Sequence, residues 1–178
     1  TYNIEELYDD DFMGNKPEDF EILQILGQKS NSISFKVMSK MNKKIYAMKS
    51  IDISKVQDLN NKQYLNELEI LKNLHHPLIT KYYKYFESES GNQIYIITEF
   101  MSNGDLTGVK EAYEKMEKPI EEEKLWDIFL QCIVALNYIH FKKIIHGDIK
   151  LDNLFMDNDG RVKIGDFGVA TKFQLGNN

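Results

Sequence analysis

The stretch His-Gly-Asp-Ile-Lys-Leu-Asp-Asn, at residues 146–153, carries most of the chemical information in this sequence. A second stretch, Gly-Asp-Phe-Gly, follows at residues 165–168, and a third, Tyr-Ala-Met-Lys, precedes both at residues 46–49. Each stretch alone is a weak signal, because short combinations of these residues occur by chance in many proteins. Their order and spacing together are highly specific.

Upstream of the two later stretches, five segments have the composition or the alternation of β-strands. They are residues 20–26, 33–37, 45–49, 79–86 and 94–100. Residues 61–74 differ, because their apolar residues recur at the spacing of one helical face. Pro77 prevents that helix from continuing. The first hundred residues therefore predict five strands with one helix before the last two.

The composition becomes helical after the breaker segment at residues 101–104. The longest helix is predicted at residues 121–143. Its apolar stripe, expected to face a core, consists of Leu125, Phe129, Cys132, Leu136 and Ile139. Short strands are predicted at 153–156 and 161–164, with a hairpin turn at 157–160. The predicted fold class is α+β, a small β-rich lobe joined to a helical lobe.

Composition excludes several classes of protein. The chain has 178 residues, 42% of them hydrophobic and 28% charged, which excludes a disordered tail and a disulfide-stapled miniprotein. The net charge of −6 argues against a general nucleic-acid binder. No apolar stretch approaches the ~18 residues of a membrane-spanning helix. A single cysteine fits a reducing compartment, and residues 1–19 are expected to be an acidic leader or linker.

The three stretches together resemble those of a eukaryotic protein kinase: a β3 lysine, an H-R-D-x-x-x-x-N catalytic loop and D-F-G. The resemblance covers residues 20–178 and implies a two-lobed fold with a five-stranded antiparallel N-lobe. Residues 20–101 would form the N-lobe with its αC helix and hinge. Residues 102–178 would form the first part of the helical C-lobe, with the A-P-E segment lying outside this sequence. Such a piece is expected to expose apolar surface.

The resemblance implies a role for each catalytic residue. Lys49 would hold the α- and β-phosphates of ATP, and Glu67 would orient that lysine through an ion pair. Asp148 would accept the proton of the substrate hydroxyl. Lys150 matches the lysine of Ser/Thr kinases that neutralises the transferred phosphoryl group, so the acceptor is expected to be Ser or Thr. Without the resemblance, Lys49 could be an ordinary strand-end lysine and Glu67 part of a solvated helix face.

The resemblance also implies the cofactors ATP and Mg²⁺. Asp166 and Asn153 would hold the metal, because hard cations prefer carboxylate and amide oxygens. Thr98 would be the gatekeeper at the back of the adenine pocket. The expected nucleotide-binding residues are Gly27, Ser34, Ala47, Lys49, Thr98, Glu99, Met101, Asp105, Asn153, Phe155 and Asp166. The remaining histidines, His75, His76 and His140, lack the spacing of a metal site and are expected to be structural or exposed.

Two regions depart from the family pattern, the glycine-rich loop and position 147. In the glycine-rich loop only Gly27 remains, while Lys29 and Ser32 replace glycines and Ser34 replaces a valine. Glycines let the backbone approach phosphate closely, so weakened ATP affinity is expected. Gly147 stands where the family has an arginine that pairs with a phosphorylated activation loop, so this switch should be absent or altered. These departures support an alternative hypothesis, a pseudokinase that acts as a scaffold for protein partners.

Softer motifs are similar to the NIMA-related (NEK) kinase group. They include residues 94–100, 103–106, 124–129, 135–140 and 162–170. This similarity implies a protein substrate, a cytoplasmic location, and partners around microtubules, centrosomes or cilia. Neither nucleic acid nor a membrane is an expected partner.

Overall fold

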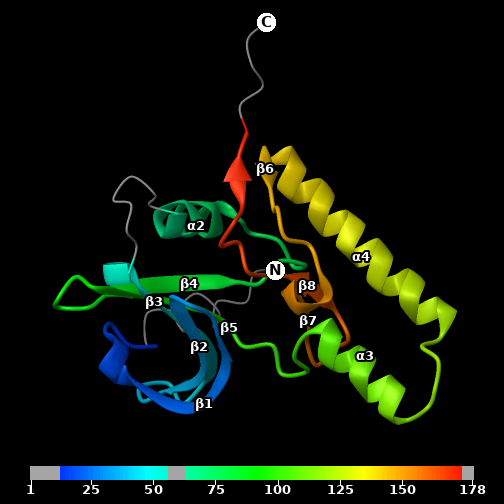
Figure 1. Ribbon diagram of the computed structural model, residues 1–178, viewed down its shortest axis with the longest axis horizontal. Helices are drawn as coiled ribbons and strands as arrows, with labels where there is room; N and C mark the ends of the chain where they lie inside the picture. Colours follow the sequence, from blue (N-terminus) through cyan, green and yellow to red (C-terminus); the bar gives the residue numbers. More distant parts are fainter. Residues whose placement is uncertain (1–12, 56–62, 174–178) are drawn as a thin grey trace, which may run out of the picture. The chain divides into compact units, whose positions relative to one another are not determined.

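The computed structural model describes residues 13–55 and 63–173. The chain divides into two compact units (Figure 1). The first unit contains residues 1–61 and Tyr82–Phe100, and the second contains Lys62–Lys81 and Met101–Asn178. Each unit is described by itself.

The first unit is built on a five-stranded antiparallel sheet, as the sequence predicted. Its strands are β1 (Phe20–Gln28), β2 (Ser32–Ser39), β3 (Ile45–Asp52), β4 (Tyr82–Glu87) and β5 (Gln93–Glu99). The order across the sheet is β1-β2-β3-β5-β4. The strand predicted to begin at Ile79 begins at Tyr82 instead. Ile79 and Thr80 belong to the second unit, where they pair with Ile164 through a parallel bridge and a backbone hydrogen bond of 3.0 Å.

Alternation along the strands gives this sheet two different faces. One face is apolar and sealed: Val37 of β2, Met48 of β3 and Ile97 of β5 are 0–3% exposed. Aromatic rings complete this cluster, with Phe20 packed edge-on against Tyr46 at 6.2 Å between ring centroids. The opposite face, called the polar face here, carries Ser34, Ala47, Lys49 and Thr98. It also carries three buried isoleucines, Ile51, Ile94 and Ile96.

The residues just before β1 complete the sealed face. Met13 is fully buried in the apolar cluster. Its carbonyl accepts a 2.7 Å hydrogen bond from the buried hydroxyl of Ser39, and the Gly14 carbonyl accepts one from Lys84 at 3.0 Å. The Asp19 carboxylate accepts hydrogen bonds from the backbone of Asn15 and Lys16, which lower its pKa. The sequence left open whether the expected leader packs, and residues 13–19 do.

The second unit combines three helices with short strands. The helices are α2 (Gln63–Asn73), α3 (Leu106–Lys115) and α4 (Glu122–Phe141). The strands are β6 (Ile144–Ile145), β7 (Leu154–Met156), β8 (Val162–Ile164) and β9 (Thr171–Lys172), paired as β6 with β9 and β7 with β8. Sequence periodicity predicted α2, α4, β7 and β8, but not the two-residue strands β6 and β9.

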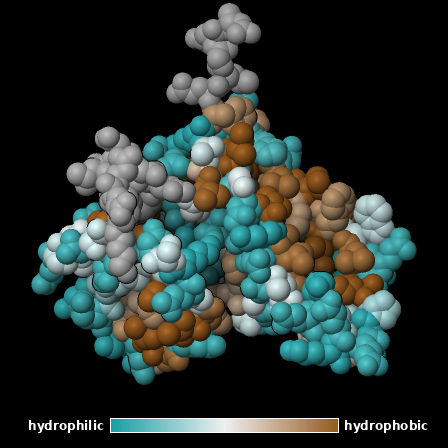
Figure 2. All heavy atoms as spheres, in the orientation of Figure 1, coloured by the Kyte–Doolittle hydropathy of each residue, from teal (hydrophilic) through white to brown (hydrophobic). Residues whose placement is uncertain are grey.

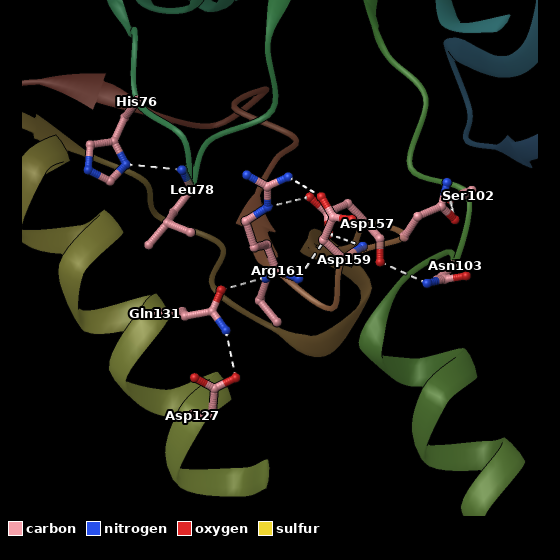
Figure 3. Close-up of polar contacts among 11 residues, drawn as sticks. His76, Leu78, Ser102, Asn103, Asp127, Gln131, Asp157, Asp159 and Arg161 are labelled. Atoms are coloured by element: carbon pink, nitrogen blue, oxygen red, sulfur yellow. Dashed lines mark hydrogen bonds and ion pairs between the residues drawn. The ribbon is translucent and has the colours of Figure 1, made fainter.

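The β7–β8 hairpin is fastened from both sides by polar contacts (Figure 3). In its turn, Asp157 accepts hydrogen bonds from the backbone of Asp159 and Arg161 at 2.9 Å, so the predicted hairpin turn is confirmed. On one side, the Asn103 amide donates to the Asp157 carbonyl at 2.7 Å. On the other, Gln131 of α4 accepts from the Val162 N–H at 2.8 Å. These contacts fix the hairpin whose second strand leads into the Gly-Asp-Phe-Gly stretch.

Of the three histidines outside the 146–153 stretch, His76 has a clear structural role. Its ring stacks on Tyr138 of α4 at 4.8 Å, and its Nδ1 accepts from the Leu78 N–H (Figure 3). Partial burial lowers the pKa of His76. Among the described residues, no group of three or more His, Cys, Asp or Glu side chains is placed to hold a metal ion by itself.

The apolar stripe of α4 is only partly a core face, which corrects the sequence expectation. Ile139 is fully buried and Cys132 is half-buried, but Leu125 and Phe129 are about half exposed. Figure 2 shows apolar residues gathered along this helix. Hydrophobic spacing indicates a helical face but not what covers it. The described part of the second unit covers only the C-terminal half of α4. No helix of the described residues is long and apolar enough to cross a membrane.

We expect Met13→Ala to lower the free energy of unfolding of the first unit by about 2–5 kcal/mol, because it removes a buried side chain and leaves a cavity. Denaturant-dependent hydrogen exchange of the β2 and β3 amides measures this. Met41 is 62% exposed in the same unit and supplies the matched control, Met41→Ala, which should change little. Equal shifts in both variants would contradict the buried position of Met13.

Candidate active site

The polar face of the first unit's sheet carries a row of site residues. Gly27 of β1 pairs with Ser34 of β2, and Ser34 pairs with Lys49 of β3. Directly paired residues of antiparallel strands point to the same face. One line across three strands therefore contains Gly27, Ser34 and Lys49, which carries the ammonium group. An anion bound along that line would meet backbone from β1 and a cation from β3.

A second row lies two residues away on the same face. Ala47 of β3 pairs with Thr98 of β5. Because residues i and i+2 share a face, these two small side chains lie beside Lys49 and leave room for a flat group. Glu99 pairs with Tyr46 at the end of β5, which directs its side chain to the sealed face. A ligand on the polar face would therefore meet the backbone of Glu99.

In the second unit, Asn153 joins the residues of the 146–153 stretch into a cluster. Its buried amide nitrogen donates to the carbonyl oxygen of Asp148 at 2.8 Å and to the carboxylate Oδ2 at 2.9 Å. The Lys150 ammonium forms an ion pair with the same Oδ2 at 2.8 Å. The backbone N–H of Asn153 donates to the Lys150 carbonyl at 3.0 Å, which closes the loop. The structure brings these three predicted residues together.

The surroundings of Asp148 keep it ionised. The hydrogen bond from Lys150 is the main cause that lowers the pKa of Asp148, and the bond from Asn153 adds to it. The same contact raises the pKa of Lys150. Both side chains remain substantially open to solvent, 37% for Asp148 and 45% for Lys150, so a substrate group can reach them. A carboxylate of low pKa is a weak base, and it acts mainly by accepting a hydrogen bond and orienting the donor.

His146 links the cluster to the Gly-Asp-Phe-Gly stretch. The fully buried ring lies 2.9 Å through Nε2 from the Gly165 carbonyl, and its Nδ1 lies 3.3 Å from the Asp148 N–H. A neutral ring with the proton on Nε2 satisfies both contacts, and burial lowers the pKa of His146. The ring also packs edge-on against the buried Phe167 at 4.8 Å. The sequence did not predict these two polar contacts of His146, because only the fold shows what its ring nitrogens meet.

Asp166 is brought next to this cluster by backbone pairing. The N–H of Gly165 donates to the Asn153 carbonyl at 2.9 Å. Gly165 has no room for a side chain, since a Cβ there would lie 2.8 Å from the Phe155 ring and 2.9 Å from the Thr80 hydroxyl. Asp166 itself has a φ of +54°, unusual for a residue other than glycine. Such backbone persists where surrounding structure imposes it, commonly at functional sites.

Residues 101–105 pair with the start of the β7–β8 hairpin. The Asn103 N–H donates to the Met156 carbonyl at 3.3 Å, and Asp105 forms an antiparallel bridge with Phe155. Met101 is buried in the second unit. The Asp105 carboxylate accepts from the Gly108 N–H at 2.9 Å and so caps the N-terminus of α3. The structure thus brings Asp105 and Phe155 together, with a capping role for Asp105 that the sequence did not predict.

The second unit offers oxygen ligands that suit Mg²⁺. The amide nitrogen of Asn153 is occupied by Asp148, so its amide oxygen is the atom that it can offer to a cation. Asp166 supplies a carboxylate directly after Gly165, whose N–H donates to the Asn153 carbonyl. Mg²⁺ usually takes one or two protein oxygens and completes its shell with phosphates and water. Asn153 and Asp166 therefore fit a magnesium ion bound together with a phosphate ligand.

Two further positions qualify the sequence interpretation. Glu67 of α2 is 5% exposed, which excludes the alternative of a solvated helix face. Gly147 has a φ of +82°, and a Cβ there would lie 3.2 Å from the Val169 carbonyl. Glycine is the favoured residue in this left-handed conformation. The substitution at position 147 therefore suits the local backbone, which sequence alone did not reveal.

Comparison with known proteins agrees with this geometry. Residues 20–178 match the family model described as protein kinase domain. The chain is 34% identical over 156 residues to a probable serine/threonine-protein kinase nek2 of Dictyostelium discoideum, covering 86% of this chain and 37% of that protein. It is 35% identical over 153 residues to serine/threonine-protein kinase Nek1 of Mus musculus, covering 86% and 12%.

A third relative belongs to another kinase group. The chain is 33% identical over 166 residues to serine/threonine-protein kinase PLK4 of Xenopus laevis, covering 93% of this chain and 17% of that protein. The chain thus spans well under half the length of each of these relatives. Two of the three are Nek kinases, which confirms the similarity to the NIMA-related group. Because the family model matches nearly all of it, the chain belongs to the protein kinase family.

Proposed function

We propose that this protein transfers the γ-phosphoryl group of ATP to Ser or Thr hydroxyls of protein substrates. The observation that carries the proposal is the cluster in which Asn153 and Lys150 both hold the Asp148 carboxylate. Phosphoryl transfer needs little covalent chemistry, because positioning and charge stabilisation supply most of the rate. This cluster supplies a hydrogen-bond acceptor for a hydroxyl and a cation beside it.

The proposed roles of the first unit's residues follow from its polar sheet face. Lys49 binds the α- and β-phosphates, and Glu67 orients its ammonium group. Ala47 packs on the adenine ring, opposite Phe155, and Thr98 lines the back of the pocket. The remaining nucleotide contacts are assigned to Gly27, Ser34, Glu99, Met101 and Asp105.

The acceptor hydroxyl is aligned by Asp148. Its low pKa keeps the carboxylate ionised at neutral pH, so it accepts a hydrogen bond from the hydroxyl. Lys150 lies 2.8 Å from the same carboxylate and neutralises charge on the phosphoryl group in flight. Asn153 and Asp166 hold Mg²⁺, which when bound neutralises charge on the phosphate oxygens.

A second candidate function is a pseudokinase scaffold. Three residues of the glycine-rich loop, Lys29, Ser32 and Ser34, differ from the family pattern, and position 147 lacks the arginine. These changes weaken nucleotide contact, but the lysine, glutamate, two aspartates and asparagine are all present. We therefore favour the enzyme. The similarity to Nek kinases supports partners at microtubules, centrosomes or cilia as part of the same proposal.

The activity is tested in the full-length protein with Mg²⁺-ATP and a generic protein substrate. We expect Asp148→Ala and Asp166→Ala each to lower kcat by about 10²–10⁴-fold, because each removes a positioned carboxylate. Asp159→Ala removes an equally charged residue from the hairpin turn and should leave kcat near wild type. Transfer by the wild type no faster than by the two catalytic variants would reject the enzyme and favour the scaffold.

We expect Lys150→Met to raise the pKa of Asp148, because the cation that favours the ionised form is lost. Titration of the Asp148 carboxyl carbon by NMR, without nucleotide, measures this. Lys150→Arg is the matched control and should keep the pKa low. In kinetic assays the acid limb of kcat/KM should move to higher pH in the Met variant, because protonated Asp148 cannot accept the hydroxyl proton. An unchanged midpoint in Lys150→Met would show that the ion pair does not control Asp148.

We expect Gly147→Ala to lower the free energy of unfolding by about 1–2 kcal/mol, because a side chain is strained at φ +82° and meets the Val169 carbonyl. Chemical denaturation measures the change. The control is Gly108→Ala in α3, where alanine suits the helix and should not destabilise. If Gly147→Ala leaves the free energy of unfolding unchanged, the left-handed backbone does not explain why position 147 is a glycine.

A further inference from the structure

The helix that carries Glu67 is fastened to the segment that follows Asp-Phe-Gly. The side-chain amide of Asn66 donates a 2.6 Å hydrogen bond to the carbonyl of Ala170. About one turn further along α2, the Glu69 carboxylate forms an ion pair with Lys172. Asn66 and Glu69 are three positions apart, so they lie on the same side of the helix. Both contacts therefore act from one helical face.

The same segment is held from another side by β6. Strand β9 pairs antiparallel with β6, with Ile145 opposite Thr171 (Figure 1). The N–H of Phe173 then donates to the Lys143 carbonyl at 3.0 Å. Strand β6 runs directly into His146. Residues 170–173 therefore connect the helix that carries Glu67 with the strand that leads into the catalytic loop.

These contacts also constrain Asp166. Ala170 lies four positions after it, and the Ala170 N–H donates to the Phe167 carbonyl at 3.0 Å, which closes the intervening turn. Ala170 is buried, so its carbonyl needs a hydrogen-bond partner. Asn66 supplies that partner, and its removal would leave the carbonyl unpaired. The Asn66 contact therefore ends on the turn that begins one residue after Asp166.

The attachment is weak enough to be reversible. Lys172 is 41% and Glu69 65% exposed, so salt screens their ion pair. The Asn66 bond is partly buried and is screened less. Position 147, the residue before Asp148, is a glycine and has no side chain to reach the segment. Among the described residues, Asn66 and Glu69 both contact this segment from α2.

We propose that Asn66 and the Glu69–Lys172 pair form a latch, the α2–β9 latch, which positions Glu67 and Asp166 for phosphoryl transfer. All three are positioning residues, since they act through Glu67 and Asp166. The latch orders residues 170–173 from α2 without an arginine at position 147. Its catalytic consequence rests on the proposed function, whereas its effect on local order does not.

The latch is tested in the full-length protein by hydrogen exchange of α2 and of residues 167–173. Asn66→Leu and Lys172→Glu should each speed exchange of these amides roughly fivefold, the effect of losing one modest interaction. The charge-swapped double variant Glu69→Lys with Lys172→Glu should restore slow exchange. The matched control is Lys110→Glu, which breaks the exposed Lys110–Glu114 pair on α3 and should leave these amides unchanged.

Two further measurements separate positioning from simple stability. Raising the salt concentration should reproduce the effect of Lys172→Glu but add little in that variant, because the ion pair alone is screened. In steady-state assays, both single variants should lower kcat several-fold with little change in KM for the protein substrate, and the double variant should restore kcat.

Unchanged exchange in both single variants overturns the latch. Faster exchange with an unaltered kcat overturns the positioning role, as does failure of the charge swap to restore either quantity. A wild type that transfers no more phosphate than Asp166→Ala overturns the proposed function instead. In that case the exchange and charge-swap results still decide whether α2 orders residues 170–173.

Discussion

The amide of Asn153 is the contact on which the chemistry of the second unit depends. One buried nitrogen holds both the backbone and the carboxylate of Asp148, while the Asn153 carbonyl holds the residue before Asp166. Loss of these partners would leave a buried amide unpaired, which costs free energy, so both bonds stabilise the cluster. Three oxygen-bearing side chains are thereby confined to one small region. The Asp148–Lys150 pair adds charge to a geometry that Asn153 has already set.

In the first unit, the five-stranded sheet has one sealed apolar face and a second face that carries both polar side chains and buried isoleucines. Met13 and Ser39 help to close the apolar side, Met13 by burying its side chain and Ser39 by bonding the adjacent carbonyl. Burial of the apolar side chains on the sealed face stabilises the sheet. The other face is then available for Lys49 and the small residues around it. The two-residue period of the strands thus places the Met13 cluster on one face and Lys49 on the other.

Much of the fold and site was predictable because the relevant signals are local. The hairpin turn at Asp157 follows from its own residues, and the sheet follows from alternation within each strand. The misjudged features all depend on distant partners. Ile79 lies outside its predicted strand because it pairs with Ile164, 85 positions later in the sequence. Leu125 has core-like spacing on α4 but is about half exposed among the described residues.

The sequence by itself determined which chemical groups this protein has and the order in which they occur, because motif spacing records residue types directly. It also determined the strand faces, since a period of two assigns each side chain to a side. Only the tertiary structure decided that Asn153 bonds Asp148, that position 147 needs a left-handed residue, and that Asn66 holds Ala170. These depend on backbone angles and on pairings across long sequence separations, which no local pattern encodes.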